Sequence, residues 1–431
     1  MHSELQVKSS YITNDNFLFY IKNFKSIIKY LYLANNYNKY YLVITNETEQ
    51  DINDINNNLI NNKTNPEFNR LNLFILCFSD KQIEWCKNNN LQSQKNTKNI
   101  DFKNNYKPTV INKVGWAFEK HTLFLDYYKD EKIQIIHIEG LDHHWNILPY
   151  LNDKIYTLVT WPCYFHISSF KTALNALFTL NKNYNKKNIC WLSPDLDGIL
   201  WSYEFGFTAI LCNQNCFLDY NKFVIKEDDK IYDMVMNCRP ELWKRPFLAE
   251  KVDNLAYIKG ATYGQQKLYD FSKLKSKYMN QNRIPMEEVL NIYNKSYCGG
   301  IFSEKEGACY SSSEYLLAGL PVISTISRGG RHTWYTPFNS VIVDASEEEV
   351  KKGVELCIYN IKNNIFNKEQ IRNHHIKMTN EMRDNFNTHI QTIFDNNNIN
   401  INTTSYFEEK YFHKMKYNIK SVDCIPLLLN R

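Results

Sequence analysis

Residues 298–325 read Cys-Gly-Gly-Ile-Phe-Ser-Glu-Lys-Glu-Gly-Ala-Cys-Tyr-Ser-Ser-Ser-Glu-Tyr-Leu-Leu-Ala-Gly-Leu-Pro-Val-Ile-Ser-Thr. The apolar run from Gly299 to Phe302 is typical of a buried strand. Residues 311–318 have helical spacing, and the following Gly-Leu-Pro predicts the end of that helix. Val322, Ile323 and Thr325 favour a second strand. The stretch therefore predicts strand, loop, short helix and strand.

In such a unit the loop presents backbone N–H groups at a helix N-terminus, which favours a phosphate. Glu306 and Glu314 stand on either side of this loop, with seven residues between them. Because a carboxylate accepts hydrogen bonds from two neighbouring hydroxyls, the pair can hold two sugars that flank a diphosphate. A structural alternative stays open. Ser311 and Glu314 match the capping-box pattern at a helix start, and Glu306 could be a solvent-exposed acidic residue of the loop.

The stretch resembles the E-x7-E donor site of retaining GT-B glycosyltransferases of the family 4 type, including the Ala-Gly-Leu-Pro-Val-Ile-Ser-Thr tail. The resemblance implies an α/β fold with two Rossmann-like domains that face a cleft. It places Glu306 on the transferred sugar and Glu314 on the ribose. The residues expected to bind the donor between them are Gly307, Ala308, Cys309, Tyr310, Ser311 and Ser312. The family commonly reads Glu-Gly-Phe-Gly where this chain has Glu-Gly-Ala-Cys, so the wall near the sugar is expected to differ.

A second motif, Arg239-Pro-Glu-Leu-Trp-Lys244, follows a predicted strand that begins near Tyr232. An arginine and a lysine five positions apart can both reach one diphosphate and stabilise its departure. The motif is similar to the Arg-x4-Lys pair of the same family, so Arg239 and Lys244 join Glu306 as expected catalytic residues. Surface cations are the alternative. Cys238 replaces the usual glycine, and Arg245 competes with Lys244 for the phosphate.

Other polar residues give weaker signals. Ser327-Arg-Gly-Gly-Arg follows the strand at 322–325, and the resemblance places Arg328, Gly329 and Gly330 beside the donor. His143 and His144 are weak candidates for contact with the sugar. The Asp-Leu-Asp run at 195–197 is better explained by helix capping than by a metal, since cationic side chains already face the diphosphate. We therefore expect no metal and no cofactor.

Composition narrows the class of protein. A chain of 431 residues predicts two domains. The net charge is only +5 and no dense basic block occurs, which argues against a nucleic-acid partner. The eleven cysteines have no paired C-x-x-C spacing, so no zinc site is expected. With a polar N-terminus and no transmembrane segment, the chain is expected to be a cytoplasmic protein, and peripheral membrane contact stays open.

Short strands that alternate with helices indicate parallel sheets. We expect an acceptor-side Rossmann-like domain over residues 1–229, a nucleotide-sugar domain over 230–390, and a helical tail over 391–431 that packs back on the first domain, the tail being implied by the resemblance. Helices are predicted at 17–35 and 116–128, and a surface loop at 88–106. The strands predicted for the first domain are 40–45, 71–78, 109–112, 132–139, 155–160, 189–192 and 208–212.

The expected function is transfer of a sugar from a UDP- or GDP-linked donor to a hydroxyl of a glycan or glycoconjugate, with retention inherited from the resemblance. The resemblance is firm over about residues 230–345 and architectural elsewhere. Two alternatives stay open: a phosphorylase of the same fold, and a partner protein that binds a nucleotide sugar without transferring it. The sequence leaves the acceptor, the general base and the oligomeric state undetermined.

Overall fold

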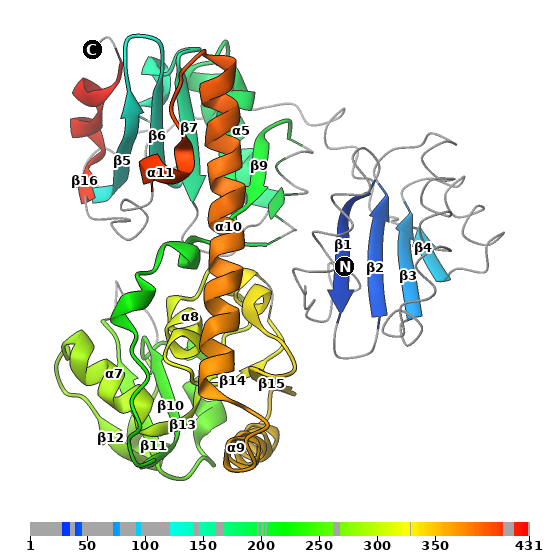
Figure 1. Ribbon diagram of the computed structural model, residues 1–431, viewed down its shortest axis with the longest axis vertical. Helices are drawn as coiled ribbons and strands as arrows, with labels where there is room; N and C mark the ends of the chain where they lie inside the picture. Colours follow the sequence, from blue (N-terminus) through cyan, green and yellow to red (C-terminus); the bar gives the residue numbers. More distant parts are fainter. Residues whose placement is uncertain are drawn as a thin grey trace.

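The structure is a computed structural model. It describes the backbone of four short segments, 28–34, 39–44, 72–77 and 92–95, and then residues 121–141, 146–160, 167–195, 198–199, 202, 205–261, 268–327, 329–407 and 418–429. The strands of these residues form one four-stranded and two six-stranded sheets (Figure 1). The two six-stranded sheets and their helices are called the first unit and the second unit below.

The four-stranded sheet has the order β1-β2-β3-β4. Its strands are β1 (Ile28–Ala34), β2 (Lys39–Ile44), β3 (Asn72–Cys77) and β4 (Gln92–Lys95). The strands predicted at 40–45 and 71–78 are confirmed. The helix predicted at 17–35 is wrong over 28–34, where alternating aromatic and aliphatic side chains form β1 opposite β2. The loop predicted at 88–106 contains β4. These strands pair among themselves, so the single sheet expected for the first half is two sheets.

The first unit is built on a sheet of order β16-β5-β6-β7-β8-β9. β6 to β9 are parallel, and β5 and β16 add antiparallel strands at one edge. The helix predicted at 116–128 is wrong over its described part, because β5 occupies it: pairing with β6 and β16 outweighs the helical spacing of its aromatics. The elements are β5 (His121–Lys129), β6 (Gln134–Glu139), β7 (Ile155–Thr160), α5 (Ile167–Leu180), β8 (Ile189–Ser193), β9 (Thr208–Leu211) and β16 (Asn418–Lys420).

The second unit has a fully parallel sheet of order β12-β11-β10-β13-β14-β15. The chain builds outward from β10 to β12 on one side and from β13 to β15 on the other, so the order reverses between β10 and β13. In open α/β sheets ligands bind at this switch point, outside the carboxyl ends of the strands. The elements are β10 (Tyr232–Cys238), β11 (Leu255–Lys259), β12 (Ser276–Met279), α7 (Met286–Asn294), β13 (Ser296–Ile301), α8 (Tyr310–Leu317), β14 (Val322–Thr325), β15 (Ser340–Val343) and α9 (Glu347–Lys362).

The strand, loop, helix and strand predicted for 298–325 are confirmed as β13, α8 and β14. Gly299 is required here by a close approach, because a Cβ at this position would lie 2.2 Å from Cδ2 of Tyr315. The ring of Tyr315 therefore packs directly on the backbone of β13, and its hydroxyl accepts the N–H of Asn237 at 2.7 Å. This contact holds α8 against the carboxyl end of β10.

Gly299→Ala is expected to lower the free energy of unfolding by about 1–3 kcal/mol or more, because the added methyl overlaps the buried Tyr315 ring. Denaturant unfolding measures the change. Gly260→Ala is the matched control, since its Cβ would meet nothing nearer than 3.4 Å. Equal effects of the two substitutions would contradict this account of the packing.

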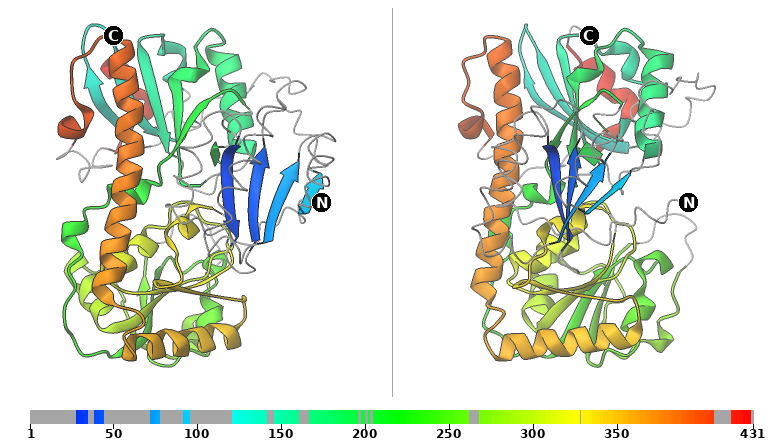
Figure 2. Two further views of the ribbon diagram at one scale, coloured as in Figure 1. Left: turned by 45° about the vertical axis from the view of Figure 1, so that its right-hand side comes forward. Right: turned by 90° about the vertical axis from the view of Figure 1, so that its right-hand side faces the viewer.

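Helix α10 (Lys368–Asn396) was not predicted from the sequence, and it joins the two units. At 1.5 Å per residue its 29 residues span roughly 44 Å. It packs against β9 and the 3₁₀ turn Gln214–Phe217 of the first unit and against α8 of the second. Both views of Figure 2 show it running along one side of the two units. Its apolar face includes Met378, Met382, Phe386, Ile390 and Phe394, all buried.

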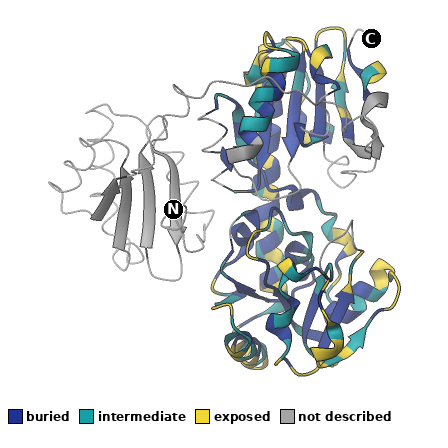
Figure 3. Ribbon diagram, turned by 180° about the vertical axis from the view of Figure 1, so that it is seen from behind, coloured by how far each residue is buried: buried dark blue, intermediate teal, exposed yellow. Residues whose placement is uncertain are grey.

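The core lies around the two six-stranded sheets, whose strands are mostly buried (Figure 3). The strands predicted at 132–139, 155–160, 189–192 and 208–212 are confirmed. The one predicted at 109–112 lies outside the described residues. The expected fold class, two α/β units with largely parallel sheets, is confirmed by this topology. β16 near the end of the chain pairs with β5 of the first unit.

Candidate functional site

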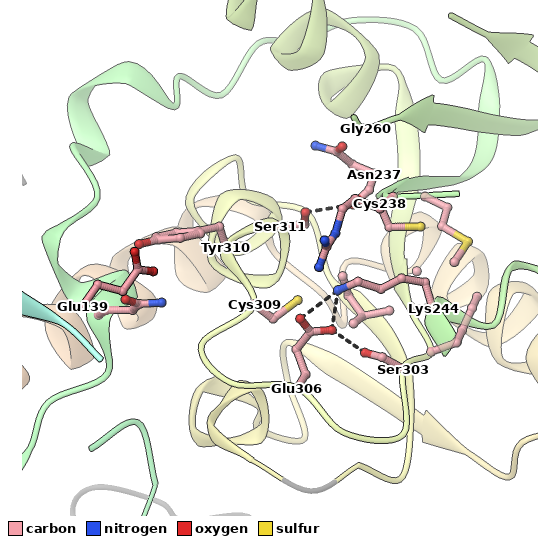
Figure 4. Close-up of a pocket in the computed structure, with 16 residues that line it drawn as sticks. Glu139, Asn237, Cys238, Lys244, Gly260, Ser303, Glu306, Cys309, Tyr310 and Ser311 are labelled. Carbon is pink, nitrogen blue, oxygen red and sulfur yellow. Dashed lines mark hydrogen bonds and ion pairs between the residues drawn. The ribbon is translucent and has the colours of Figure 1, made fainter. Parts of the chain in front are cut away.

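A cavity of about 320 Å³ lies at the switch point of the second unit. Its walls come from the carboxyl ends of β10 and β13, from Gly260 after β11, and from the N-terminus of α8. The first unit contributes Glu139, at the end of β6, and Gln214. The cavity is therefore bounded by both units, with the cationic residues of the second unit on one wall and a carboxylate of the first unit on another (Figure 4).

Lys244 and Glu306, predicted from separate motifs, meet in this cavity. Nζ of Lys244 donates to Oε1 of Glu306 at 2.7 Å and to Oε2 at 2.5 Å. Their side chains are 13% and 12% exposed, so the ion pair is largely shielded from water. The hydroxyl of Ser303 donates to Oε2 of Glu306 at 2.6 Å (Figure 4). Glu306 is therefore held by a cation and a hydroxyl, and the solvated loop acid is excluded.

A buried arginine lies behind this pair. The guanidinium of Arg331 is fully buried and donates to Oγ of Ser303 at 2.8 Å and to the carbonyl of Thr325 at 2.7 Å. The polar chain runs from Arg331 through Ser303 and Glu306 to Lys244. It fixes the Glu306 carboxylate and adds positive charge behind it. Ser303 was missed in the sequence, although its place three residues before Glu306 and two residues after the strand was a usable signal.

Arg239 and Lys244 are organised by the ring of Trp243. Nζ of Lys244 lies 4.2 Å and Cζ of Arg239 lies 5.3 Å from the Trp243 ring, as cation–π contacts. The indole N–H donates to the buried carboxylate of Glu241 at 2.5 Å, and Nη1 of Arg239 lies 3.6 Å from the same group. Arg245 pairs with Glu304 at 3.2 Å and does not line the cavity. Between the two adjacent cations, Lys244 is the one that faces the site.

The loop residues expected to bind the donor are only partly in the cavity. Cys309, Tyr310 and Ser311 line it, whereas Gly307, Ala308 and Ser312 do not. Ser312 is buried and its hydroxyl donates to Oη of Tyr335 at 2.8 Å. Cys309, where the resemblance led us to expect a glycine, has a left-handed backbone with φ 53°. Burial raises the pKa of the Cys309 thiol to about 12 and that of Cys238 to about 11, so both stay protonated at neutral pH.

Glu314 is half-buried on α8 and does not line the cavity. Its Oε2 accepts the hydroxyl of Tyr293 at 2.8 Å, and Tyr293 accepts the side-chain amide of Asn237 at 2.5 Å. The capping-box alternative is wrong: the helix begins after Cys309, and the Ser311 hydroxyl donates to the carbonyl of Asn237 at 2.8 Å. Burial raises the pKa of Glu314 above its usual value.

Glu314→Gln is expected to stabilise the protein at neutral pH and to have less effect in acid. Because the folded-state pKa of Glu314 is raised, its contribution to stability is fully present below the ordinary glutamate pKa of 4.5 and is lost as pH rises through the folded-state pKa. Glutamine has no ionisable group, so it avoids the loss of stability at neutral pH, and its carbonyl still accepts the Tyr293 hydroxyl. Thermal unfolding from about pH 4 to pH 8 measures the difference between the two curves. An equal shift at every pH would contradict a raised pKa at Glu314.

The remaining predicted residues lie elsewhere. Gly329 and Gly330 are described but do not line the cavity. His143, His144, Arg328 and Asp197 lie outside the described residues. Oδ1 of Asp195 accepts the N–H of Gly198 at 2.9 Å, which agrees with the capping interpretation. In the described ranges, no group of three or more His, Cys, Asp or Glu is arranged to hold a metal ion.

The sequence matches no protein-family model and no curated protein. Several solved structures match large parts of this chain at low sequence identity. HepE from Anabaena, in complex with UDP, is 10% identical over 75% of this chain and 92% of its own, with a TM-score of 0.43. Sucrose-phosphate synthase from Thermosynechococcus elongatus is 12% identical over 61% of this chain and 74% of its own, with a TM-score of 0.45.

TarM is 11% identical over 77% of this chain and 94% of its own, with a TM-score of 0.40. All of these TM-scores are below 0.5. None of the helices among the described residues is long and apolar enough to span a membrane.

Proposed function

We propose that the chain is a glycosyltransferase that moves a sugar from a nucleoside diphosphate-sugar to a hydroxyl acceptor, with retention of anomeric configuration. The observation that carries this proposal is the cavity at the switch point between β10 and β13, which gathers Arg239, Lys244, Glu306 and the N-terminus of α8. Two cations and a helix N-terminus suit a diphosphate. A carboxylate at the same place suits the hydroxyls of a sugar.

In the proposed reaction the bond between the anomeric carbon and the diphosphate breaks, and the diphosphate leaves with both electrons of that bond. Lys244 and Arg239 stabilise the negative charge that develops on it, which is the task that a metal ion performs in other transferases. The acceptor hydroxyl attacks from the face that the diphosphate leaves, which retains configuration, and its proton passes to a departing phosphate oxygen. Glu306 orients the sugar, and Glu314 is proposed to reach the ribose.

The acceptor is proposed to enter from the side of the first unit. Glu139 at the carboxyl end of β6 lines the cavity and points toward Tyr310 of the second unit (Figure 4). No described residue donates a hydrogen bond to the Glu139 carboxylate, so this acceptor group is available to a substrate hydroxyl. Gln214 also lines the cavity, and its amide can both donate and accept a hydrogen bond. This combination suits a polyhydroxyl acceptor, as in a glycan.

The test is release of nucleoside diphosphate from a panel of UDP- and GDP-sugars, with and without glycan acceptors, followed by NMR assignment of the anomeric centre of the product. Turnover of one donor with retained configuration supports the proposal. Turnover that needs inorganic phosphate and no nucleotide would establish a phosphorylase instead. Tight binding of a nucleotide sugar without transfer or hydrolysis would establish a binding protein.

A further inference from the structure

The loop before α8 has a backbone shape that suits an anion. Cys309 adopts φ 53° and ψ 82°, and the right-handed helix begins at the next residue. A left-handed residue followed by a right-handed one turns successive N–H groups toward the same side and forms a nest for an anion. The nest, residues 309–311, lines the cavity. A cysteine in this conformation costs free energy, so neighbouring groups must hold it there.

One side chain, Asn215, holds the nest from the first unit. Its Nδ2 donates to the carbonyl of Ala308 at 2.7 Å and to the carbonyl of Cys309 at 3.0 Å, and it lies 2.9 Å from Oγ of Ser313. In a planar trans peptide the N–H points opposite to the C=O. Since two consecutive carbonyls face Asn215, the N–H groups of Cys309 and Tyr310 face away from it. Asn215 therefore sets the direction of the nest.

Asn215 belongs to the first unit, whereas the nest belongs to the second. It lies in the 3₁₀ turn after β9 and is fully buried. Its own N–H donates to Oδ1 of Asn213 at 3.0 Å, and Nδ2 of Asn213 donates to the carbonyl of Gly330 at 2.9 Å. Thr333 adds a hydrogen bond to the carbonyl of Pro194 at 3.0 Å. Two neighbouring asparagines and a threonine thus dock the units beside the cavity.

The hydrogen bonds of Asn215 show that it positions the nest and does more than hold the two units together. The three acceptors of its amide are the carbonyl of Ala308, directly before the nest, the carbonyl of Cys309 in the nest, and the hydroxyl of Ser313 in the first turn of α8. Its Oδ1 is buried and makes no hydrogen bond to the described residues, which is an energetic cost. The reversed amide would place this oxygen against two carbonyl oxygens, so the orientation of the side chain is fixed. The side-chain oxygen of Asn215 is left without a hydrogen bond in the orientation that lets its amide N–H groups donate to the two carbonyls.

We propose that Asn215 is a positioning residue through which the first unit shapes the diphosphate-binding nest of the second. The inference rests on the proposed donor site and names the part of the chain that makes it competent. Separation of the units would remove the Asn215 hydrogen bonds from both carbonyls and leave that of Cys309 with the N–H of Ser312 alone. Cys309 could then relax, so diphosphate binding and docking of the units favour each other. A nucleoside diphosphate is the ligand class that the nest takes.

The test compares nucleoside diphosphate binding by wild type, Asn215→Ala and Thr333→Val, using calorimetry with UDP and GDP and with inorganic pyrophosphate as a base-free probe. Thr333→Val is the matched control, because it removes an interface hydrogen bond that does not touch the nest. We expect Asn215→Ala to weaken binding about tenfold or more, as for a hydrogen-bonded anion site, and Thr333→Val to change it less than about twofold.

A second substitution separates positioning from stability. Glycine adopts the left-handed conformation readily, so Cys309→Gly in the Asn215→Ala background is expected to restore most of the lost affinity. Cys309→Gly restores no contact between the units. If Asn215→Ala weakened binding only by loosening the contact between the units, the loss of affinity would therefore persist. Circular dichroism and thermal unfolding check that each variant is folded.

Wild-type affinity in Asn215→Ala, equal losses in Asn215→Ala and Thr333→Val, or no recovery with Cys309→Gly would overturn the inference. Pyrophosphate binding that depends on Asn215, without binding of either nucleotide, would retain the nest and reject the proposed function. Failure of all three anions to bind the wild type would overturn both.

Discussion

Lys244→Ala is expected to lower kcat for sugar transfer by about 10²–10³-fold, the usual cost of removing a group that stabilises transition-state charge. Donor binding should weaken less, because Arg239 and the nest still hold the diphosphate. The physical reason is the position of Lys244: its ammonium is shielded in the cavity and contacts Glu306 at the carboxyl end of β13. Initial rates over a range of donor concentrations measure both effects.

The control for Lys244 is its neighbour. Arg245→Ala removes a cation that pairs with Glu304 and does not line the cavity, so activity should change by less than about twofold. Lys244→Ala also leaves Glu306 without its ion pair, which lowers stability. The double variant Lys244→Ala with Glu306→Gln removes both charges and should recover thermal stability without recovering activity. Equal activity in Lys244→Ala and wild type would reject the role of this lysine.

Glu306→Gln is expected to have opposite effects on catalysis and on product binding. Transfer should fall about 10²-fold, because the carboxylate no longer orients the sugar. Affinity for the free nucleoside diphosphate should rise about three- to tenfold, since removal of a nearby negative charge is worth on the order of 1 kcal/mol. The increase in affinity is expected because Glu306 now pairs with Lys244 at 2.5–2.7 Å. Without that carboxylate, Lys244 interacts with the phosphate alone.

Calorimetry with the nucleoside diphosphate measures the increase in affinity, and initial rates with the donor measure the loss of transfer. Both use the same preparation. Glu304→Gln is the matched control, because Glu304 lies two residues earlier in the same loop and is 66% exposed. It should leave both quantities within about twofold of wild type. Weaker nucleotide binding by Glu306→Gln would show that the Glu306 carboxylate does not reduce the attraction of Lys244 for the phosphate.

The second unit was more predictable than the first because its elements are local. The apolar run, the loop, the helix and the β-branched strand of 298–325 agree with β13, α8 and β14, since the period of the side chains sets each element. The helices expected at 17–35 and 116–128 failed over 28–34 and 121–128. There, pairing with other strands decided between two conformations that the aromatic residues allow.

The candidate site shows the same division. Glu306 and Lys244 were selected from their motifs, but their direct contact was not predicted, because 62 positions separate them in the chain. Ser303 and Arg331 form the support behind Glu306. The closeness of Ser303 to Glu306 in the chain was a usable signal, whereas the role of Arg331 has no local signature. The raised pKa of Glu314 comes from burial on α8, which a motif does not report.

The sequence by itself determined the β13, α8 and β14 unit, the chemistry of the acidic and cationic residues, and the parallel α/β class. These follow from local periodicity and residue type. Only the tertiary structure decided how the sheets divide, that α10 spans both units, and that Asn215 of one unit holds the nest of the other. The physical reason is that strand pairing and hydrogen bonds between distant segments depend on where the whole chain places them, whereas propensity acts within a few neighbouring residues.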